Sequence, residues 1–304
     1  LASEFSLTPE ERQILVIALA ASVDLAYEKI YAYVNDDVGK KRPTVGLVLE
    51  ILADTPEQAV AFRPLLFEDS SLVRHHLISV SEDGSSFLSH YVDISGHVAE
   101  RLLGYQGIDP LLDGFVRPAA PCDQIPEMAG QLGCALRAGT PTRINLAGRW
   151  KAEKRALALA ACHEAGLQLC CVDAPALRDA ANSRELLGVL DREGRLMGSA
   201  LLFENWDSVS EDKAFLANPA ARRLLAEFPL PILFDTPSDV TPLGTEIDLT
   251  VAVPLPGLSQ RVKLWNAQED VAASTGYEPD HLSLLRLGSE QIAAAARMAR
   301  SLAR

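Results

Sequence analysis

Hydrophobic residues in the first third of the chain recur mostly with the spacing of α-helices. In residues 6–22, Thr8 is a suitable N-cap and is followed by a proline at the first helical position. The apolar positions that follow have the period of one helix face: Ile14, Ile17, Ala18 and Ala21. We predict further helices with the same kind of pattern at 24–36, 42–52, 55–66 and 96–104.

Two short segments of this first part have the character of strands instead. Residues 76–80 and 87–94 are rich in β-branched, aromatic and other apolar residues, and the polar turn residues of 81–86 separate them. They predict an antiparallel β-hairpin. A set of helices followed by a β-hairpin is the arrangement of a winged-helix module, so this is the fold that we predict for residues 1–117.

From about residue 142 the pattern changes to apolar runs that alternate with helical segments. Such runs are typical of the strands of a parallel sheet that helices cover on both faces. The expected strands are 142–147, 167–173, 199–204, 230–235 and 246–254. The expected helices are 154–165, 183–194 and, with a break at Pro219, 211–228. The alternation predicts an α/β core with a parallel sheet.

The segments on either side of this core set the expected domain boundaries. Residues 118–130 belong to a proline-rich stretch and are expected to form a linker. The α/β core is assigned to 131–254, and the helical pattern of 255–304 predicts a small helical lid after it. A length of 304 residues suits two or three domains, so we expect a multi-domain protein.

Charge narrows the possible partners. The net charge is −13, and residues 1–118 carry nine Lys and Arg against eighteen Asp and Glu. Such a surface repels nucleic acid, and the cluster at 39–43 is its one basic exception. The predicted helix at 42–52 offers no suitable side chains for contacting bases. A protein partner is therefore the favoured interpretation, and DNA binding is a less favoured alternative.

Cysteine and histidine positions give no sign of a metal site. The five cysteines and six histidines lack the spacing of ligand sets, and Cys170 and Cys171 lie within an apolar run. Buried thiols of this kind indicate a reducing cytoplasm. No apolar run approaches the roughly 20 residues of a membrane span, and no N-terminal targeting pattern is present. We therefore expect a cytoplasmic protein that is not inserted in a membrane.

Residues 147–160 have the outline of a phosphate-binding loop and the helix that follows it. Gly148 and Lys154 fit the pattern G-x4-G-K-[ST], but Glu153 replaces its second glycine and Arg155 its hydroxyl residue. Two like charges about 4 Å apart cost about 4 kcal/mol at an effective dielectric constant of about 20, which is roughly a thousandfold in affinity. A Glu153 carboxylate beside the phosphates would therefore oppose a triphosphate, and the Arg155 cation would repel Mg²⁺.

The order of these features resembles an AAA+ ATPase module: a strand, this loop, a helix, a strand that ends in an acid, a sensor-type strand and a helical lid. Residues 27–45, YEKIYAYVNDDVGKKRPTV, are similar to the winged-helix domain that precedes a degenerate AAA module in a bacterial group of AAA+ ATPases. The resemblance covers nearly the whole chain. It implies the N-terminal part of a larger ATPase that forms a homo-oligomeric ring, with an intact ATPase module after residue 304.

The resemblance also assigns further residues to a vestigial nucleotide site. Glu204 takes the place of the metal-associated acid, and Asn205 takes the water-activating position, where an amide cannot accept a proton. Thr236 stands at the first sensor, and Arg297 lies on a helix similar to the one that carries the second sensor. The implied nucleotide-binding residues are Gly148, Lys154, Arg155, Thr236 and Arg297.

The joint changes at the loop and at the acid suggest an internal ion pair. We predict that Lys154 or Arg155 reaches Glu204, so that a side-chain cation stands where Mg²⁺ would be bound. No cofactor is then expected, and ATP with Mg²⁺ is the alternative. The leading hypothesis is a docking and regulatory region with a catalytically degenerate module, while a second module hydrolyses ATP. The other hypotheses are a weak but genuine ATPase and a winged-helix DNA-binding regulator.

Overall fold

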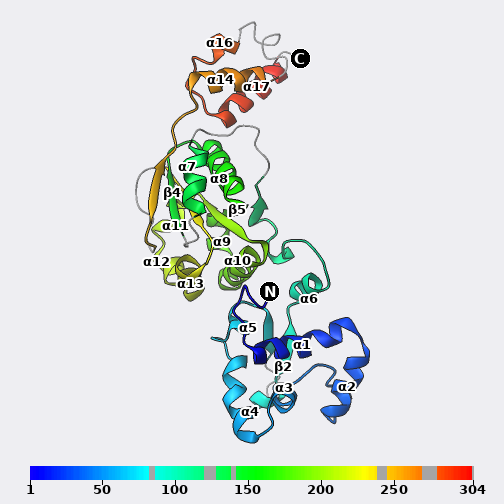
Figure 1. Cartoon of the computed structure of the whole chain (residues 1–304). Helices are drawn as coiled ribbons and strands as arrows, with labels where there is room; N and C mark the ends of the chain where they lie inside the picture. The colour runs from blue at the N-terminus through cyan, green and yellow to red at the C-terminus, as the bar shows by residue number, and fades with distance from the viewer. Residues whose placement is uncertain (82–85, 120–127, 138–141, 238–244, 269–278, 303–304) are drawn as a thin grey trace. The chain divides into compact units, whose positions relative to one another are not determined.

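The computed structural model describes residues 1–81, 86–119, 128–137, 142–237, 245–268 and 279–302 (Figure 1). Its internal contacts divide the chain into two compact units. Unit 1 comprises Leu1–Asp113 and Arg184–Leu196. Unit 2 comprises Gly114–Ser183 and Met197–Arg304.

Unit 1 begins with a helix whose start is encoded locally. Helix α1 spans Pro9–Val23, and Thr8 is its N-cap. The Thr8 hydroxyl accepts a hydrogen bond from the Glu11 N–H at 3.2 Å, and the Glu11 carboxylate accepts one from the Thr8 N–H at 2.9 Å. This capping box satisfies backbone donors that the first turn of a helix leaves without partners. The predicted N-cap is confirmed.

The other N-terminal elements of unit 1 are short helices and one hairpin. The helices are α2 (Ala26–Val34), α3 (Val45–Leu52), α4 (Pro56–Phe62), α5 (Ser71–Arg74) and α6 (Gly96–Leu102). Strands β1 (Ile78–Ser81) and β2 (Tyr91–Ile94) pair antiparallel, which confirms the predicted hairpin. The second strand is shorter than predicted, because Phe87–Ser89 form a 3₁₀ turn in which the Ser89 hydroxyl donates to the Ser86 carbonyl.

Helix α10 (Ser183–Met197) contributes a distant segment of the chain to unit 1. Its Asp191, Arg192 and Glu193 are buried, and buried charges are stable only when they are paired. Asp191 Oδ2 lies 2.6 Å from His75 Nδ1, and Arg192 forms an ion pair with Asp109. The partners of the Glu193 carboxylate include Arg192, His97 and Arg101. The sequence predicts this helix but does not indicate that it packs with unit 1.

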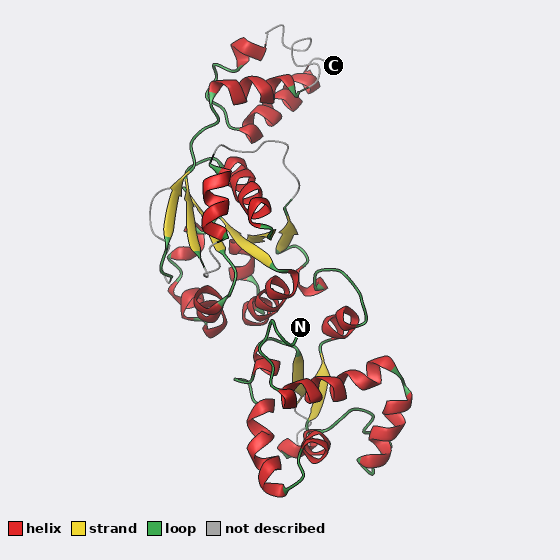
Figure 2. Ribbon diagram, in the orientation of Figure 1, coloured by secondary structure: helices red, strands yellow, loops and turns green. Residues whose placement is uncertain are grey.

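Unit 2 is built on a twisted sheet that has six strands in the described residues (Figure 2). The strands are β3 (Val116–Pro118), β4 (Arg143–Ala147), β5 (Gln168–Asp173), β6 (Ser199–Glu204), β7 (Ile232–Thr236) and β8 (Leu249–Ala252). Their order in the sheet is β3-β5-β6-β7-β4-β8. The strands β5, β6, β7, β4 and β8 are each parallel to their neighbours in this order, whereas the edge strand β3 pairs antiparallel with β5. The expected parallel sheet is therefore a mixed one.

Part of the proline-rich stretch that was predicted to be a linker has regular secondary structure. The prolines around 118–130 suggest irregular structure, yet Val116–Pro118 form β3 and Ala129–Leu136 form helix α7. Proline is tolerated at the edge of a sheet, where its missing N–H costs no inner ladder bond. Residues 120–127 lie outside the described part of the chain.

Helices cover the sheet and bury its apolar strands. Helix α8 spans Lys151–Ala165 and starts three residues before the predicted 154. It packs against α7 and against β5, β6 and β7, and the core on this face includes the buried Leu146, Leu157 and Leu202. The other helices between the strands are α9 (Ala174–Asp179), α11 (Asp207–Ser210), α12 (Lys213–Ala217) and α13 (Pro219–Glu227).

Among the described residues of unit 2, three helices follow the sheet. They are α14 (Leu258–Asn266), α16 (Pro279–Leu282) and α17 (Ser289–Leu302). They share a small core around the buried side chains of Trp265, Ile292 and Ala296. Across the described residues, no helix is both long and apolar enough to span a bilayer.

Candidate functional site

The candidate site lies at the carboxyl ends of β4 and β7. Strands β4 and β7 are neighbours in the sheet. The chain runs from β4 to β5, which lies toward one edge of the sheet, and from β7 to β8, which lies at the opposite edge. Ligands of open α/β sheets bind where neighbouring strands have connections in opposite directions. Ala147 pairs with Thr236 at these strand ends, and the Gly148 N–H donates to the Thr236 carbonyl at 3.0 Å.

A hollow of about 420 Å³ opens at this point. Four of its side chains are cationic and two are anionic, so its lining carries an excess of positive charge. The hollow is lined by Gly148, Arg149, Lys151, Lys154, Pro175, Arg178, Asn205, Asp207, Ser208, Asp235 and Pro237. Gly148, Lys154 and Asn205 were predicted from the sequence. The cations Arg149, Lys151 and Arg178 were not, because they lie at no distinctive spacing.

Gly148 is required by the geometry of the loop. Its φ of 143° lies in a region that favours glycine. A Cβ at this position would lie 2.7 Å from the carbonyl oxygen of Val253, on the backbone that follows β8. The glycine therefore allows the β4 loop to pass close to the neighbouring strand end, whether or not a ligand is bound.

Lys154 is buried and fully engaged within the protein. Its side chain is 2% exposed, and its ammonium group forms an ion pair with Asp235. The same Nζ donates to the Gly148 carbonyl and to the Thr236 carbonyl, the latter at 2.9 Å. A lysine ammonium has three N–H donors. All three have protein acceptors here, so a phosphate could bind Lys154 only by displacing one of them.

Glu153 corrects one expectation about the loop. Its carboxylate does not line the hollow but accepts a hydrogen bond from the Ser289 N–H at 2.6 Å, at the first residue of α17. A carboxylate is favourable there because helix N-termini carry partial positive charge. Trp150 packs beside it, since a Cβ on Gly288 would lie 2.8 Å from Trp150 Cε3. Glu153 thus joins the loop helix to α17 instead of taking the place of a phosphate.

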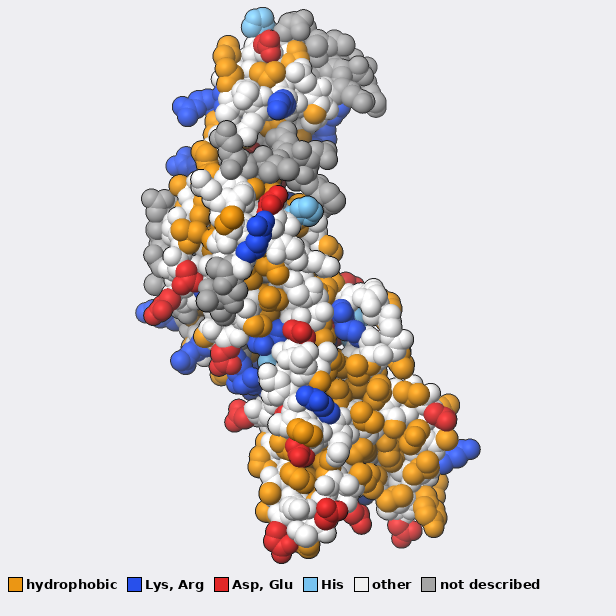
Figure 3. Space-filling model, in the orientation of Figure 1, with side chains coloured by type: hydrophobic (Ala, Val, Ile, Leu, Met, Phe, Trp, Pro, Cys, Tyr) orange, Lys and Arg blue, Asp and Glu red, His pale blue; other side chains and the backbone are white. Residues whose placement is uncertain are grey.

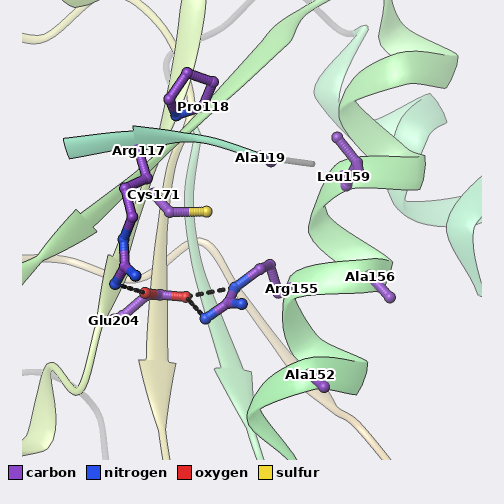
Figure 4. A pocket seen from close by; sticks show the side chains of 9 residues that line it. All are labelled: Arg117, Pro118, Ala119, Ala152, Arg155, Ala156, Leu159, Cys171 and Glu204. Carbon is purple, nitrogen blue, oxygen red and sulfur yellow. Dashed lines mark hydrogen bonds and ion pairs between the residues drawn. The ribbon is translucent and has the colours of Figure 1, made fainter. Parts of the chain in front are cut away.

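Of the two cations predicted to reach Glu204, Lys154 and Arg155, it is Arg155 that pairs with it (Figure 4). Its Nε and Nη2 atoms lie 2.7 and 2.6 Å from Glu204 Oε1. Arg117 of β3 approaches the other carboxylate oxygen, with Nη2 3.9 Å from Oε2. Burial would lower the pKa of Arg155, but the hydrogen bond and charge of Glu204 outweigh it and raise the pKa above its usual value. The guanidinium therefore stays charged beside the acid.

The Arg155–Glu204 pair borders a second hollow of about 320 Å³ between α8 and the sheet edge. Figure 4 shows both arginines pointing toward Glu204 from opposite sides. Apolar side chains such as Leu159 and Pro118 form much of the remaining wall, together with the buried thiol of Cys171. Burial raises the pKa of Cys171 to about 12, with the charge of Glu204 as a further cause, so the thiol is protonated near neutral pH.

Asn205 and Thr236 are both held by neighbouring side chains. Asn205 has a φ of 56°, a left-handed conformation that asparagine tolerates, and its Oδ1 accepts a hydrogen bond from Lys151. The hydroxyl of Thr236 donates to Asn145 Oδ1 at 2.7 Å inside the sheet. The hydroxyl expected at the first sensor is thus directed at Asn145.

Four of the assigned residues do not line the larger hollow: Arg155, Glu204, Thr236 and Arg297. Arg297 is exposed on α17 and lines neither of the two hollows. Within the described ranges, no three His, Cys, Asp or Glu side chains are grouped as ligands for a metal ion. The geometry therefore unites Gly148, Lys154 and Asn205 in the hollow and sets Arg155 with Glu204 beside it.

Comparison with known proteins identifies the first domain. Residues 1–115 match the family model described as "Winged helix domain, variant", in agreement with the predicted fold of this part. No curated protein matches the chain. A solved structure described as "Structural Basis for Katanin Self-Assembly" is similar with a TM-score of 0.46 and 16% identity, over 64% of this chain and 78% of that chain. A likeness of this extent leaves the activity to be inferred from the site residues.

Proposed function

We propose that this chain is the docking and regulatory region of an AAA+ ATPase, with a winged-helix domain followed by a nucleotide-binding module that has lost catalysis. The observation that carries the proposal is that the two cations at the lysine and hydroxyl positions of the loop are both paired inside the protein. Lys154 is neutralised by Asp235, and Arg155 is bound to Glu204. In this arrangement a second, intact module hydrolyses ATP in the assembled ring.

The pair of Arg155 and Glu204 supports the loss of metal binding. Mg²⁺ in such sites needs oxygen ligands, including the hydroxyl that follows the loop lysine and an acid at the end of a neighbouring strand. Here an arginine replaces the hydroxyl and binds the acid at 2.6 Å. Asn205 cannot act as a general base. A nucleotide bound in the hollow would therefore lack both its metal and a group that activates water.

A weak ATP-binding module is the second candidate, and one observation favours it. The larger hollow keeps Gly148 and Lys154 and adds the cations of Arg149, Lys151 and Arg178 around them. A phosphate group would meet an excess of positive charge there. Its affinity is opposed by the need to separate Lys154 from a buried partner, since an unpaired buried charge is costly.

Calorimetry with ATP and Mg²⁺ separates the two candidates. For the degenerate module we expect no binding tighter than 1 mM and no phosphate release. The double variant Lys154→Met with Asp235→Asn serves as the control, because it removes the loop lysine without leaving a buried charge unpaired and should give the same baseline as the natural chain. Micromolar binding that this double variant abolishes, together with slow release of phosphate, would establish the weak ATPase instead.

A further inference from the structure

Helix α2 exposes an apolar stripe that no described residue of unit 1 covers. All nine residues of α2 are described, and of these one is buried: Tyr31, whose hydroxyl donates to the Ile17 carbonyl at 2.6 Å. Four large apolar or aromatic side chains remain exposed, and we call them the α2 stripe. They are Tyr27 (41% exposed), Ile30 (50%), Tyr33 (86%) and Val34 (50%).

The stripe has the spacing of a helix that binds another helix. Tyr27, Ile30 and Val34 are separated by three and four residues, so they lie on one face of α2, with Tyr33 at its border. Such i, i+3, i+7 anchors are typical of helical recognition surfaces. Two of the four residues are tyrosines, which are enriched among the side chains that carry the binding energy of interfaces.

Further exposed apolar side chains lie next to α2 in the chain. Val23 ends α1, Leu25 lies in the turn between the helices, and Val38 follows α2; they are 59%, 69% and 86% exposed. In Figure 3 hydrophobic side chains gather over the region of unit 1 where Figure 1 places α1 and α2. Large contiguous apolar patches on a protein surface usually mark interaction sites.

Acidic residues flank the stripe at both ends. Asp24 precedes α2, and Asp36 and Asp37 follow it, all of them exposed. Four cations lie in the same stretch of the chain. Lys41 approaches Glu28 at 3.8 Å, and Arg42 binds Asp93 at 2.7 Å. Lys29 lies about 100° or more around α2 from Ile30 and Val34, and Lys40 follows Asp37. The wider surroundings are acidic as well, because residues 1–118 carry twice as many acidic as basic side chains.

We propose that the α2 stripe binds an amphipathic helix of a partner protein whose apolar face is flanked at each end by lysine or arginine. This inference rests on the proposed docking role of unit 1 and adds the surface and the chemistry of the partner. Apolar contact with the stripe supplies affinity, and the flanking charges orient the partner and speed its association.

The same charges argue against a second copy of this chain as the occupant. In an antiparallel pair of α2 helices, Asp24 of one copy would face Asp36 and Asp37 of the other. In a parallel pair, like residues would face each other. Either arrangement sets carboxylates against carboxylates, and like charges juxtaposed in an interface are costly.

Three labelled peptides of 18 residues test the proposal with the full chain. The first is a synthetic helix with a leucine stripe and two lysines at each end; the second has glutamates in place of the lysines. The third keeps the lysines but replaces the leucines by serines. Fluorescence anisotropy at two salt concentrations should show binding of the first peptide at least tenfold tighter than binding of either other peptide.

Variants of the chain locate the binding surface. Ile30→Ser with Tyr33→Ser should weaken binding of the first peptide at least tenfold, and Asp36→Asn with Asp37→Asn should reduce the salt dependence. The matched control is Ile51→Ser with Val60→Ser, two exposed apolar positions on α3 and α4 that are 56% and 64% exposed. All of these side chains are exposed, and circular dichroism checks that each variant folds.

Several outcomes would overturn the proposal. Equal binding of the lysine and glutamate peptides would show that the flanking charges are not recognised. Equal losses of binding in the test and control variants would show that the α2 stripe is not the binding surface. Dimers in sedimentation that Tyr33→Ser abolishes would identify a second copy as the occupant. None of these measurements involves nucleotide. They can therefore disprove the docking surface without affecting the proposal of a degenerate module, and calorimetry with ATP can disprove the degenerate module without affecting the docking surface.

Discussion

At the residue scale, the properties of the candidate site depend on the ion pair that each of its charged side chains forms. Lys154 and Arg155 are neighbours in sequence, yet one is buried against Asp235 and the other reaches Glu204 at the second hollow. Successive residues of a helix point about 100° apart, so the two cations leave α8 in different directions. The buried ion pair depends on both members, because removing one leaves an uncompensated charge.

Replacing Asp235 with asparagine tests this dependence. Asp235→Asn keeps the shape of the side chain but leaves the Lys154 ammonium without its counter-ion. We expect a loss of about 3–5 kcal/mol in the free energy of unfolding in urea at pH 7. The double variant Asp235→Asn with Lys154→Met should recover most of this loss, since it removes the buried charge. A single variant as stable as the natural chain would show that the ion pair is not formed.

At the scale of elements, Glu153 links two helices that the chain separates by more than a hundred residues. Its carboxylate accepts the Ser289 N–H, and Trp150 packs against Gly288, so the first turn of α8 and the start of α17 hold each other. The glutamate that spoils the phosphate-binding pattern is therefore used as a cap for α17. Such caps contribute about 0.5–2 kcal/mol to the helix that they serve.

Hydrogen exchange measures this contribution directly. Glu153→Ala should speed exchange of the amides in the first turns of α17 about two- to thirtyfold, the range that corresponds to a cap of 0.5–2 kcal/mol. Glu290→Ala is the matched control, because Glu290 lies in the first turn of α17 itself and is exposed. Similar effects of the two substitutions would mean that Glu153 acts only through general charge at this end of α17.

At the scale of the whole molecule, the chain folds as two units that are not continuous in sequence. Unit 1 is completed by α10, which follows α9 and precedes β6 of unit 2 in the chain. Helix α10 packs closely on unit 1 at Gly188, where a Cβ would lie 2.3 Å from His76 Nε2. Each unit has a separate core, which favours separate responses to destabilisation.

Two arginines of α10 provide a comparison at this scale. Arg192→Met leaves Asp109 without its buried partner, so we expect a loss of about 3–5 kcal/mol that is confined to unit 1. Arg184→Met removes an exposed pair with Glu68 and should cost less than about 1 kcal/mol. Hydrogen exchange should show faster exchange in β1 and β2 of the Arg192 variant, with β4 and β7 unchanged. Equal acceleration in both sets of strands would show that the two units unfold together.

The sequence by itself determined the elements and the pairs that depend on neighbouring segments. The bounds of β6, the N-cap at Thr8 and the winged-helix pattern follow from local periodicity and turn chemistry, which short stretches encode. The pair of Arg155 with Glu204 was also predictable, because an α/β sheet brings the loop helix beside the end of β6. The five predicted strands pair parallel with one another, as expected. The antiparallel edge strand β3 was not predicted, because its short, proline-containing segment has no strand pattern.

Only the tertiary structure decided the remaining contacts. Asp235 could be predicted to end a strand, but not to be the counter-ion of Lys154. Glu153 could be predicted to disturb the loop, but its bond to Ser289 depends on where α17 lies. The placement of α10 in unit 1 likewise depends on charges near residues 75 and 109 that no local pattern connects to it. A side chain takes the donor or acceptor that folding brings within about 3 Å, and distance along the chain does not specify that choice.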